Sequence, residues 1–120
     1  MVTQKKKIGN FGEKLAEKFF EKKGYQVIKK NWSVPEGEID LICQKDKEIL
    51  FVEVKTRTKK GYGWAEDSVD ENKLKRINAA IDEFLMQNPK YDEYSPSLDI
   101  LVIEIFDLIP KFVHYENVEL

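Results

Sequence analysis

Apolar residues recur every three or four positions in two stretches of the chain, a spacing that predicts two amphipathic helices. The first stretch covers residues 8–23, and Gly24 stands where a glycine commonly ends a helix. The second covers residues 71–87, with Asp70 in position to cap its first turn and Pro89 in position to stop it. The long stretch between these helices follows a different pattern.

The other apolar segments are short, rich in Val, Ile, Leu and aromatic residues, and bounded by turn-forming residues, which is typical of strands. They cover residues 25–28, 37–44, 49–57, 97–106 and 111–118. The polar turn at residues 45–48 predicts an antiparallel hairpin, whereas residues 31–37, with Pro35, are predicted to be a connection. The order α-β-β-β-α-β-β predicts a single α/β domain over residues 1–120, with a mixed central sheet of about five strands flanked by helices.

The predicted hairpin carries ionisable residues inside otherwise apolar strands. Because side chains alternate between the two faces of a strand, these residues are expected to share one face. That face consists of Glu38, Asp40, Glu53, Lys55 and Arg57. On the first strand it also includes Ile42, and the opposite face is expected to hold Ile39, Leu41 and Cys43. If the polar faces of the two strands meet, Asp40 and Glu53 come within reach of one ion.

Two interpretations fit this polar face. Carboxylate oxygens from Asp40 and Glu53 suit Mg²⁺ or Mn²⁺, with Lys55 beside the ion to orient water or to stabilise charge on a phosphate. Alternatively, Glu38 and Asp40 form ion pairs with Lys55 and Arg57 across the hairpin. Charges embedded in apolar sequence favour the functional interpretation.

Glu13 lies at the edge of the apolar stripe of the first predicted helix, on the side of Ala16 and Phe20. A helix packed on the sheet would aim Glu13 at the acidic pair, as a further ligand or a water-mediated contact. The alternative is an exposed helix glutamate close to Lys14 and Lys18. The sequence leaves both open.

The net charge of −2 is unevenly distributed, with nine Lys against three Glu in residues 1–35 and two Lys against seven acidic residues in residues 89–120. This balance alone does not suggest a nucleic-acid partner. No apolar run is long enough for a membrane span or a signal peptide. The single cysteine excludes an intrachain disulfide and indicates a reducing, cytoplasmic location. One cysteine and one histidine also argue against a zinc site.

Three parts of the sequence together resemble a known family: Glu13, the run GEIDLI at residues 37–42 and the run FVEVKTR at residues 51–57. They resemble the bacterial YraN family, which is similar to Holliday-junction resolvases and restriction enzymes of the PD-(D/E)XK nuclease superfamily. The resemblance covers nearly the whole chain. It implies a restriction-endonuclease-like fold and a DNA endonuclease that depends on Mg²⁺ or Mn²⁺.

The resemblance also implies roles for individual residues. Asp40, Glu53 and Glu13 are expected to bind the metal, and Lys55 is expected to be the catalytic lysine. Lys73 either reaches the scissile phosphate or is a solvated helix lysine. The residues expected to attract the DNA backbone are Arg57, Lys59, Lys60 and Lys73. The accessory acids are Glu38 and Asp99, of which Asp99 either supports the site or only accepts backbone hydrogen bonds.

The expected substrate is double-stranded or branched DNA, and cutting two strands suggests a homodimer. The chain departs from the superfamily pattern because Glu38-Ile39-Asp40 lacks the proline of its name. Ser33 stands where relatives commonly carry an arginine, which removes one expected phosphate contact. The loop with Tyr62 and Trp64 either stacks on bases or is an ordinary exposed loop. The alternative function is a non-catalytic nucleic-acid-binding or assembly module on the same fold.

Overall fold

The computed structural model describes residues 3–59 and 69–119, so Lys60, Tyr62 and Trp64 lie outside the described residues. Its centre is a five-stranded sheet with the strands side by side in chain order. The strands are β1 (Gln26–Val34), β2 (Gly37–Lys45), β3 (Glu48–Thr58), β4 (Ser95–Ile105) and β5 (Lys111–Tyr115). Strands β3 and β4 run parallel, and the other neighbouring pairs are antiparallel.

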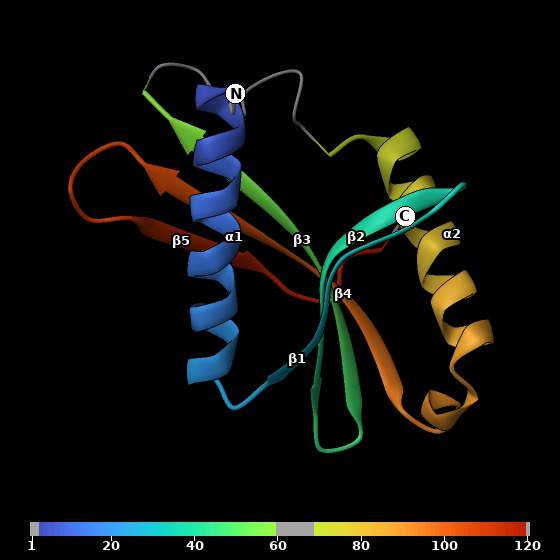
Figure 1. Cartoon of the computed structure of the whole chain (residues 1–120). Coiled ribbons are helices and arrows are strands. Elements are labelled where there is room, and N and C mark those ends of the chain that lie inside the picture. Colours follow the sequence, from blue (N-terminus) through green and yellow to red (C-terminus); the bar gives the residue numbers. More distant parts are fainter. Residues whose placement is uncertain (1–2, 60–68, 120) are drawn as a thin grey trace.

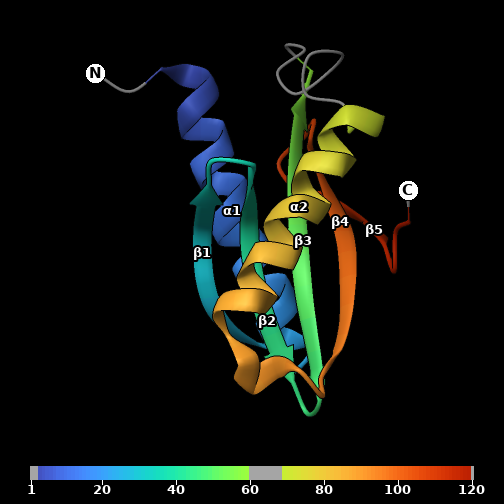
Figure 2. The same ribbon diagram turned by 90° about the vertical axis from the view of Figure 1, so that its right-hand side faces the viewer.

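The two long helices cover opposite faces of this sheet (Figure 1). Helix α1 (Gln4–Lys22) lies on one face and helix α2 (Glu71–Gln87) on the other, with the short 3₁₀ helix η2 (Pro89–Tyr91) after α2. Figure 2 shows α2 in front of β2 and β3, with α1 on the far side. The predicted α/β class, mixed five-stranded sheet and element order are confirmed and are consistent with a nuclease-like fold.

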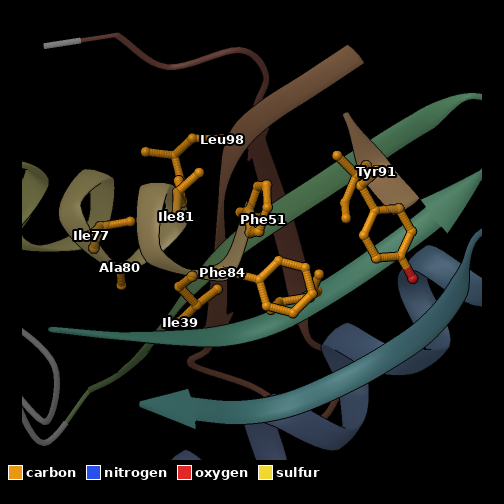
Figure 3. Close-up of a cluster of buried hydrophobic side chains, with 10 residues drawn as sticks. Ile39, Phe51, Ile77, Ala80, Ile81, Phe84, Tyr91 and Leu98 are labelled. Carbon is orange, nitrogen blue, oxygen red and sulfur yellow. The ribbon is translucent and has the colours of Figure 1, made fainter. Parts of the chain in front are cut away.

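Each face of the sheet has its own apolar core. On the α2 side, ten buried residues pack together around Phe51 and Phe84, whose ring centroids lie 5.7 Å apart (Figure 3). On the α1 side, eight buried residues pack around Phe20 and Leu41. Burial on both faces requires apolar residues at successive positions of the central strands, which explains the continuous run Ile49–Val52 in β3.

The helix limits follow from capping. Helix α2 begins and ends where predicted, and the Asp70 Oδ1 accepts a hydrogen bond of 2.8 Å from the Lys73 backbone N–H. Helix α1 begins at Gln4, four residues before the predicted start, because the Thr3 hydroxyl caps a polar first turn that carries no apolar signal. Gly24, with a φ of 94°, follows the end of α1 as predicted. Among the described residues, no helix is long and apolar enough to cross a lipid bilayer.

Strand β1 is longer than predicted. Residues 31–34, expected in a connection, continue the strand to Val34 and pair with β2. They do so because Trp32 and Val34 pack against the α2-side core, and the Trp32 ring meets Phe84 edge-on at 5.3 Å. The connection is limited to the turn at residues 35–36, and β5 ends at Tyr115 rather than at residue 118.

The predicted alternation of β2 is wrong at one position. Leu41 and Cys43 face α1, but Ile39 faces α2 together with Ile42, although these two residues are three positions apart. The break coincides with Asn31, which lies opposite Asp40 in β1 and has a φ of 50°. Asparagine tolerates this left-handed conformation, which bends the strand pair and breaks the period of two. The irregularity therefore lies at Asp40.

Candidate active site

Asp40 lies where strands β2 and β3 stop pairing through their backbones. The antiparallel register runs from Lys45 opposite Glu48 to Leu41 opposite Val52. At the next position the Asp40 Oδ2 accepts a hydrogen bond of 2.7 Å from the backbone N–H of Val54. The carboxylate thus takes the place of a backbone carbonyl, and its side chain is fixed against β3.

Asp40 and Glu53 form a close carboxylate pair at this point. Burial raises the pKa of Asp40 well above its ordinary value, and the charge of Glu53 and a side-chain hydrogen bond with Glu53 raise it further. The hydrogen bond from Val54 acts in the opposite direction. Two carboxylates in such contact repel each other unless they share a proton or a cation lies beside them.

Helix α2 supplies a cation to this pair. The Lys73 Nζ lies 2.7 Å from the Glu53 Oε2, and the Glu53 side chain is 5% exposed. Burial alone would lower the pKa of Lys73, but the hydrogen bond to Glu53 and the charge of Glu53 outweigh it, so that the pKa is raised. Lys73 is therefore a partner of the buried acid rather than a solvated helix lysine.

Lys55 is buried on the same strand, with 5% of the residue exposed. It follows Glu53 by two positions and so extends from the same face of β3. A side-chain interaction with Lys55 contributes to the raised pKa of Lys73, which places the two lysine side chains next to each other. The structure thus brings together Asp40, Glu53, Lys55 and Lys73.

Glu13 approaches the pair from α1. Burial raises the pKa of Glu13, a side-chain hydrogen bond with Asn31 opposes this, and the charges of Glu38 and Glu53 add to the increase. The close packing of α1 on β3 makes this approach possible, since a Cβ atom at Gly12 would overlap the Thr56 hydroxyl. Glu13 is within electrostatic reach of the pair. Among the described residues, however, Glu13, Asp40 and Glu53 do not form a set of three with ligand atoms within 4.8 Å.

A pocket of about 340 Å³ opens between the turn after β1 and helix α2; Lys73, the partner of Glu53, lines it, whereas Asp40 and Glu53 do not. Glu38 is exposed and lines it together with Lys73 and Arg76. The close approach of the two elements requires Gly37, because a Cβ there would overlap the Arg76 carbonyl. Sequence reasoning missed Arg76 and Asn31; the spacing of Arg76 three residues after Lys73 was the available signal.

The other predicted residues lie elsewhere. Arg57 is partly buried near the end of β3. The Lys59 ammonium lies 3.3 Å from Asp107, and both side chains are exposed. Asp99 is buried on the α1 side of β4, in a separate polar network described below. Lys60 lies outside the described residues.

Comparison with known proteins identifies relatives along nearly the whole chain. The family described as "Uncharacterised protein family UPF0102" matches residues 12–109. A UPF0102 protein of Caldanaerobacter subterraneus is 38% identical, over 97% of this chain and 92% of the relative. Another from Syntrophomonas wolfei is 35% identical, over 93% of this chain and 96% of the relative. The expected YraN family is the same family, and the chain belongs to UPF0102.

Proposed function

We propose that the protein is a metal-dependent DNA endonuclease that hydrolyses phosphodiester bonds. The observation that carries the proposal is the contact between the partly buried Asp40 and the buried Glu53, with the cations of Lys55 and Lys73 beside it. Burying two carboxylates side by side raises the free energy of the folded protein, so that such a pair is more often kept for a function than for stability.

The donor set fits Mg²⁺ or Mn²⁺. Asp40 and Glu53 offer only carboxylate oxygens, which these hard ions prefer, and Glu13 adds a third acid nearby. A bound ion of this kind lowers the pKa of its water and neutralises charge on a phosphate. It would also remove the repulsion that raises the pKa of Asp40.

The protein's own residues supply positioning and charge. Asp40 is fixed by its bond to Val54, so its second oxygen has a defined direction. Lys55 lies beside the pair as a buried cation, where it orients a water molecule or stabilises charge on the phosphate. Lys73 pairs with Glu53 in the structure, and it would be available to contact the phosphate if a metal ion neutralised Glu53 instead.

The proposed substrate is double-stranded or branched DNA in the cytoplasm. Lys73 and Arg76 line the pocket between α2 and the turn after β1, Arg57 lies near the end of β3, and Lys59 and Lys60 come next in the sequence. A homodimer would place two such sites on two strands.

The test is cleavage of branched, linear and single-stranded DNA in Mg²⁺, Mn²⁺ or EDTA. We expect cleavage only with a metal, and a loss of at least about a hundredfold in Asp40→Asn and Glu53→Gln. Asp46→Asn is the matched control, because Asp46 is an exposed turn residue. Undiminished cleavage by the Asp40 and Glu53 variants would contradict the proposal.

A non-catalytic nucleic-acid-binding module is the second candidate. It is favoured by the Glu53–Lys73 ion pair, which compensates one buried charge without any metal. In that case the wild-type protein would bind DNA equally well in Mg²⁺ and in EDTA, and no condition would yield product.

A further inference from the structure

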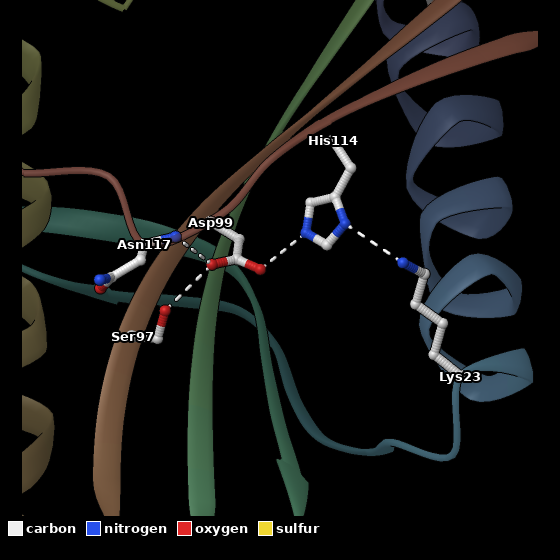
Figure 4. A network of polar contacts seen from close by, with 5 residues as sticks. All are labelled: Lys23, Ser97, Asp99, His114 and Asn117. Atoms are coloured by element: carbon white, nitrogen blue, oxygen red, sulfur yellow. Dashed lines mark hydrogen bonds and ion pairs between the residues drawn. The ribbon is translucent and has the colours of Figure 1, made fainter.

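A second buried carboxylate, Asp99, anchors a polar network on the α1 side of the sheet (Figure 4). The Asp99 Oδ1 accepts hydrogen bonds from the Ser97 hydroxyl at 3.0 Å and from the Asn117 backbone N–H at 2.9 Å. The Asp99 Oδ2 lies 2.7 Å from the His114 Nε2. One oxygen is therefore held by two donors, and the other is directed at the imidazole.

The His114 ring is held in place by its surroundings. It stands edge-on to the Phe19 and Phe20 rings of α1, at centroid distances of 5.5 and 5.3 Å. The side chain is 13% exposed. The carboxylate and the imidazole therefore face each other before any ligand binds, and a metal at Nε2 would replace the hydrogen bond between them.

Glu116, one residue after the end of β5, completes a set of three. One carboxylate oxygen of Glu116 and the facing atoms of Asp99 and His114 all lie within 4.8 Å of one another. Ligand atoms bound to one zinc ion at about 2.0–2.2 Å lie no more than about 4.4 Å apart. Glu116 is exposed, so its side chain is free to rotate and bring its oxygen into this range.

We propose that Asp99, His114 and Glu116 bind a divalent transition-metal ion of the zinc class. The imidazole nitrogen favours Zn²⁺, Co²⁺ or Ni²⁺ over Mg²⁺, in contrast to the oxygen donors of Asp40 and Glu53. The sequence argued against zinc because the chain has one cysteine and one histidine. The fold compensates for this by bringing two carboxylates to the histidine.

The surroundings leave room for the remaining coordination. A pocket of about 260 Å³ is lined by two of the three ligands, Asp99 and Glu116, together with Ser97 and Tyr25, whereas His114 does not line it. Three protein ligands with water in an open position are typical of zinc sites that are not purely structural. The site is separate from the first, since Asp99 lies beside Val52 on the α1 face while Glu53 faces α2.

Lys23 determines which nitrogen of the His114 ring carries the proton. Its Nζ lies 3.4 Å from the His114 Nδ1, which makes Nδ1 an acceptor and places the imidazole proton on Nε2, facing Asp99. Coordination through Nε2 moves that proton to Nδ1, and the Lys23 ammonium must then leave. Lys23 is exposed at the end of α1 and is free of this constraint once it turns into solvent.

The experiment uses the tag-free, full-length protein, because its single histidine makes the imidazole signal unambiguous. Nitrogen-15 NMR of the imidazole is recorded during titration with Zn²⁺ in excess Mg²⁺, which occupies oxygen-only sites. We expect one equivalent of Zn²⁺ to shift Nε2 to a metal-bound value and to leave the proton on Nδ1. Unchanged imidazole shifts at saturating Zn²⁺ would overturn the proposal.

Variants test the other ligands without removing the histidine. Glu116→Gln should weaken Zn²⁺ binding at least about tenfold, since even outer partners of a metal ligand contribute 10–100-fold. Glu119→Gln, an exposed neighbour, is the matched control and should bind as the wild type does. Lys23→Met should bind about threefold more tightly, because no ammonium has to leave, whereas Lys22→Met should not. Equal affinity of Glu116→Gln and wild type would refute the assigned ligand set.

Discussion

The molecule places a carboxylate on each face of its sheet, the buried Asp99 and the partly buried Asp40, and the two are compensated in different ways. Asp99 receives donors at both oxygens: a hydroxyl, a backbone N–H and an imidazole. Asp40 receives one backbone N–H and otherwise faces Glu53, a second acid, and its pKa is raised. Burial alone therefore does not indicate what a carboxylate does, because its partners determine whether it stabilises the fold.

This difference predicts substitutions with opposite effects on stability. At Asp99 the network is complete, so truncation leaves donors unpaired. At Asp40 the negative charge is under-compensated, so neutralising it relieves repulsion. The measurements below use urea unfolding in EDTA without DNA, which excludes any contribution from bound metal or substrate.

The largest effect is expected at Asp99. Asp99→Ala should lower the free energy of unfolding by about 3 kcal/mol, because Ser97, Asn117 and His114 lose a buried acceptor. Asp92→Ala, at an exposed position, should change it by less than about 0.5 kcal/mol. A similar small loss in both variants would mean that Asp99 is as poorly compensated as Asp40.

The next largest effect is expected at Lys73, and it should distinguish Lys73 from Lys75, another lysine of helix α2. Lys73→Met should cost about 2 kcal/mol, because Glu53 remains buried without its cation, although Lys73 itself is partly exposed. Lys75→Met is the matched control, since its pair with Glu71 is exposed and contributes about 0.5 kcal/mol or less. Equal losses in the two variants would show that the Glu53 pair behaves as a surface pair.

The contrast between the two regions also explains what the sequence revealed of the fold. Both ends of helix α2 were predicted correctly, because the spacing of its apolar residues and the Asp70 cap indicate the same first residue. The start of α1 was missed because its first turn is polar, and the end of β1 was missed because Pro35 suggested a connection. The first error concerns a local cap, Thr3, which leaves no apolar signal, and the second concerns residues that pack against a distant partner, the core under α2.

The sequence predicted the part of the candidate site that depends on the alternation of side chains between the two faces of a strand. Glu53 and Lys55 share a face of β3 as expected, but the alternation in β2 breaks at Ile39, opposite the left-handed Asn31. The family resemblance pointed to Lys73 as a residue that reaches the phosphate, but its ion pair with Glu53 was not predicted. The partnership of Asp99 with His114, 15 residues apart, depends on the register of β4 with β5, which sequence patterns do not encode.

A stabilising substitution is expected at Asp40. Asp40→Asn should raise the free energy of unfolding by about 1 kcal/mol at about pH 8, because the amide oxygen still accepts the Val54 N–H while the repulsion from Glu53 disappears. The raised pKa means that the folded protein holds this proton more tightly than the unfolded chain. Wild-type stability therefore falls as pH rises from the unfolded pKa through the folded pKa.

The advantage of Asp40→Asn over wild type should thus grow with pH above the ordinary pKa of 3.8 and then level off. Asp46→Asn, in the exposed turn, should show no such pH-dependent difference. A variant that is less stable than wild type across the whole range would show that Asp40, like Asp99, is well compensated.

The smallest effect is expected at Glu13, whose carboxylate is better compensated than that of Asp40 but less well than that of Asp99. Its pKa is raised by burial and by neighbouring acids, but the Asn31 hydrogen bond opposes that increase. Glu13→Gln should therefore stabilise by only about 0.5 kcal/mol at about pH 8, with the same direction of pH dependence as Asp40→Asn. Glu17, one helical turn after Glu13, is partly exposed and pairs with Lys30, so Glu17→Gln removes this attraction together with a repulsion from Glu13 and should not stabilise. The double variant Asp40→Asn/Glu13→Gln separates two explanations. If Glu13→Gln stabilises the Asp40→Asn protein as much as it stabilises wild type, the repulsion on Glu13 comes from Glu38 and Glu53. If it does not stabilise the Asp40→Asn protein, that repulsion came from Asp40, and Glu13, Asp40 and Glu53 act as one cluster.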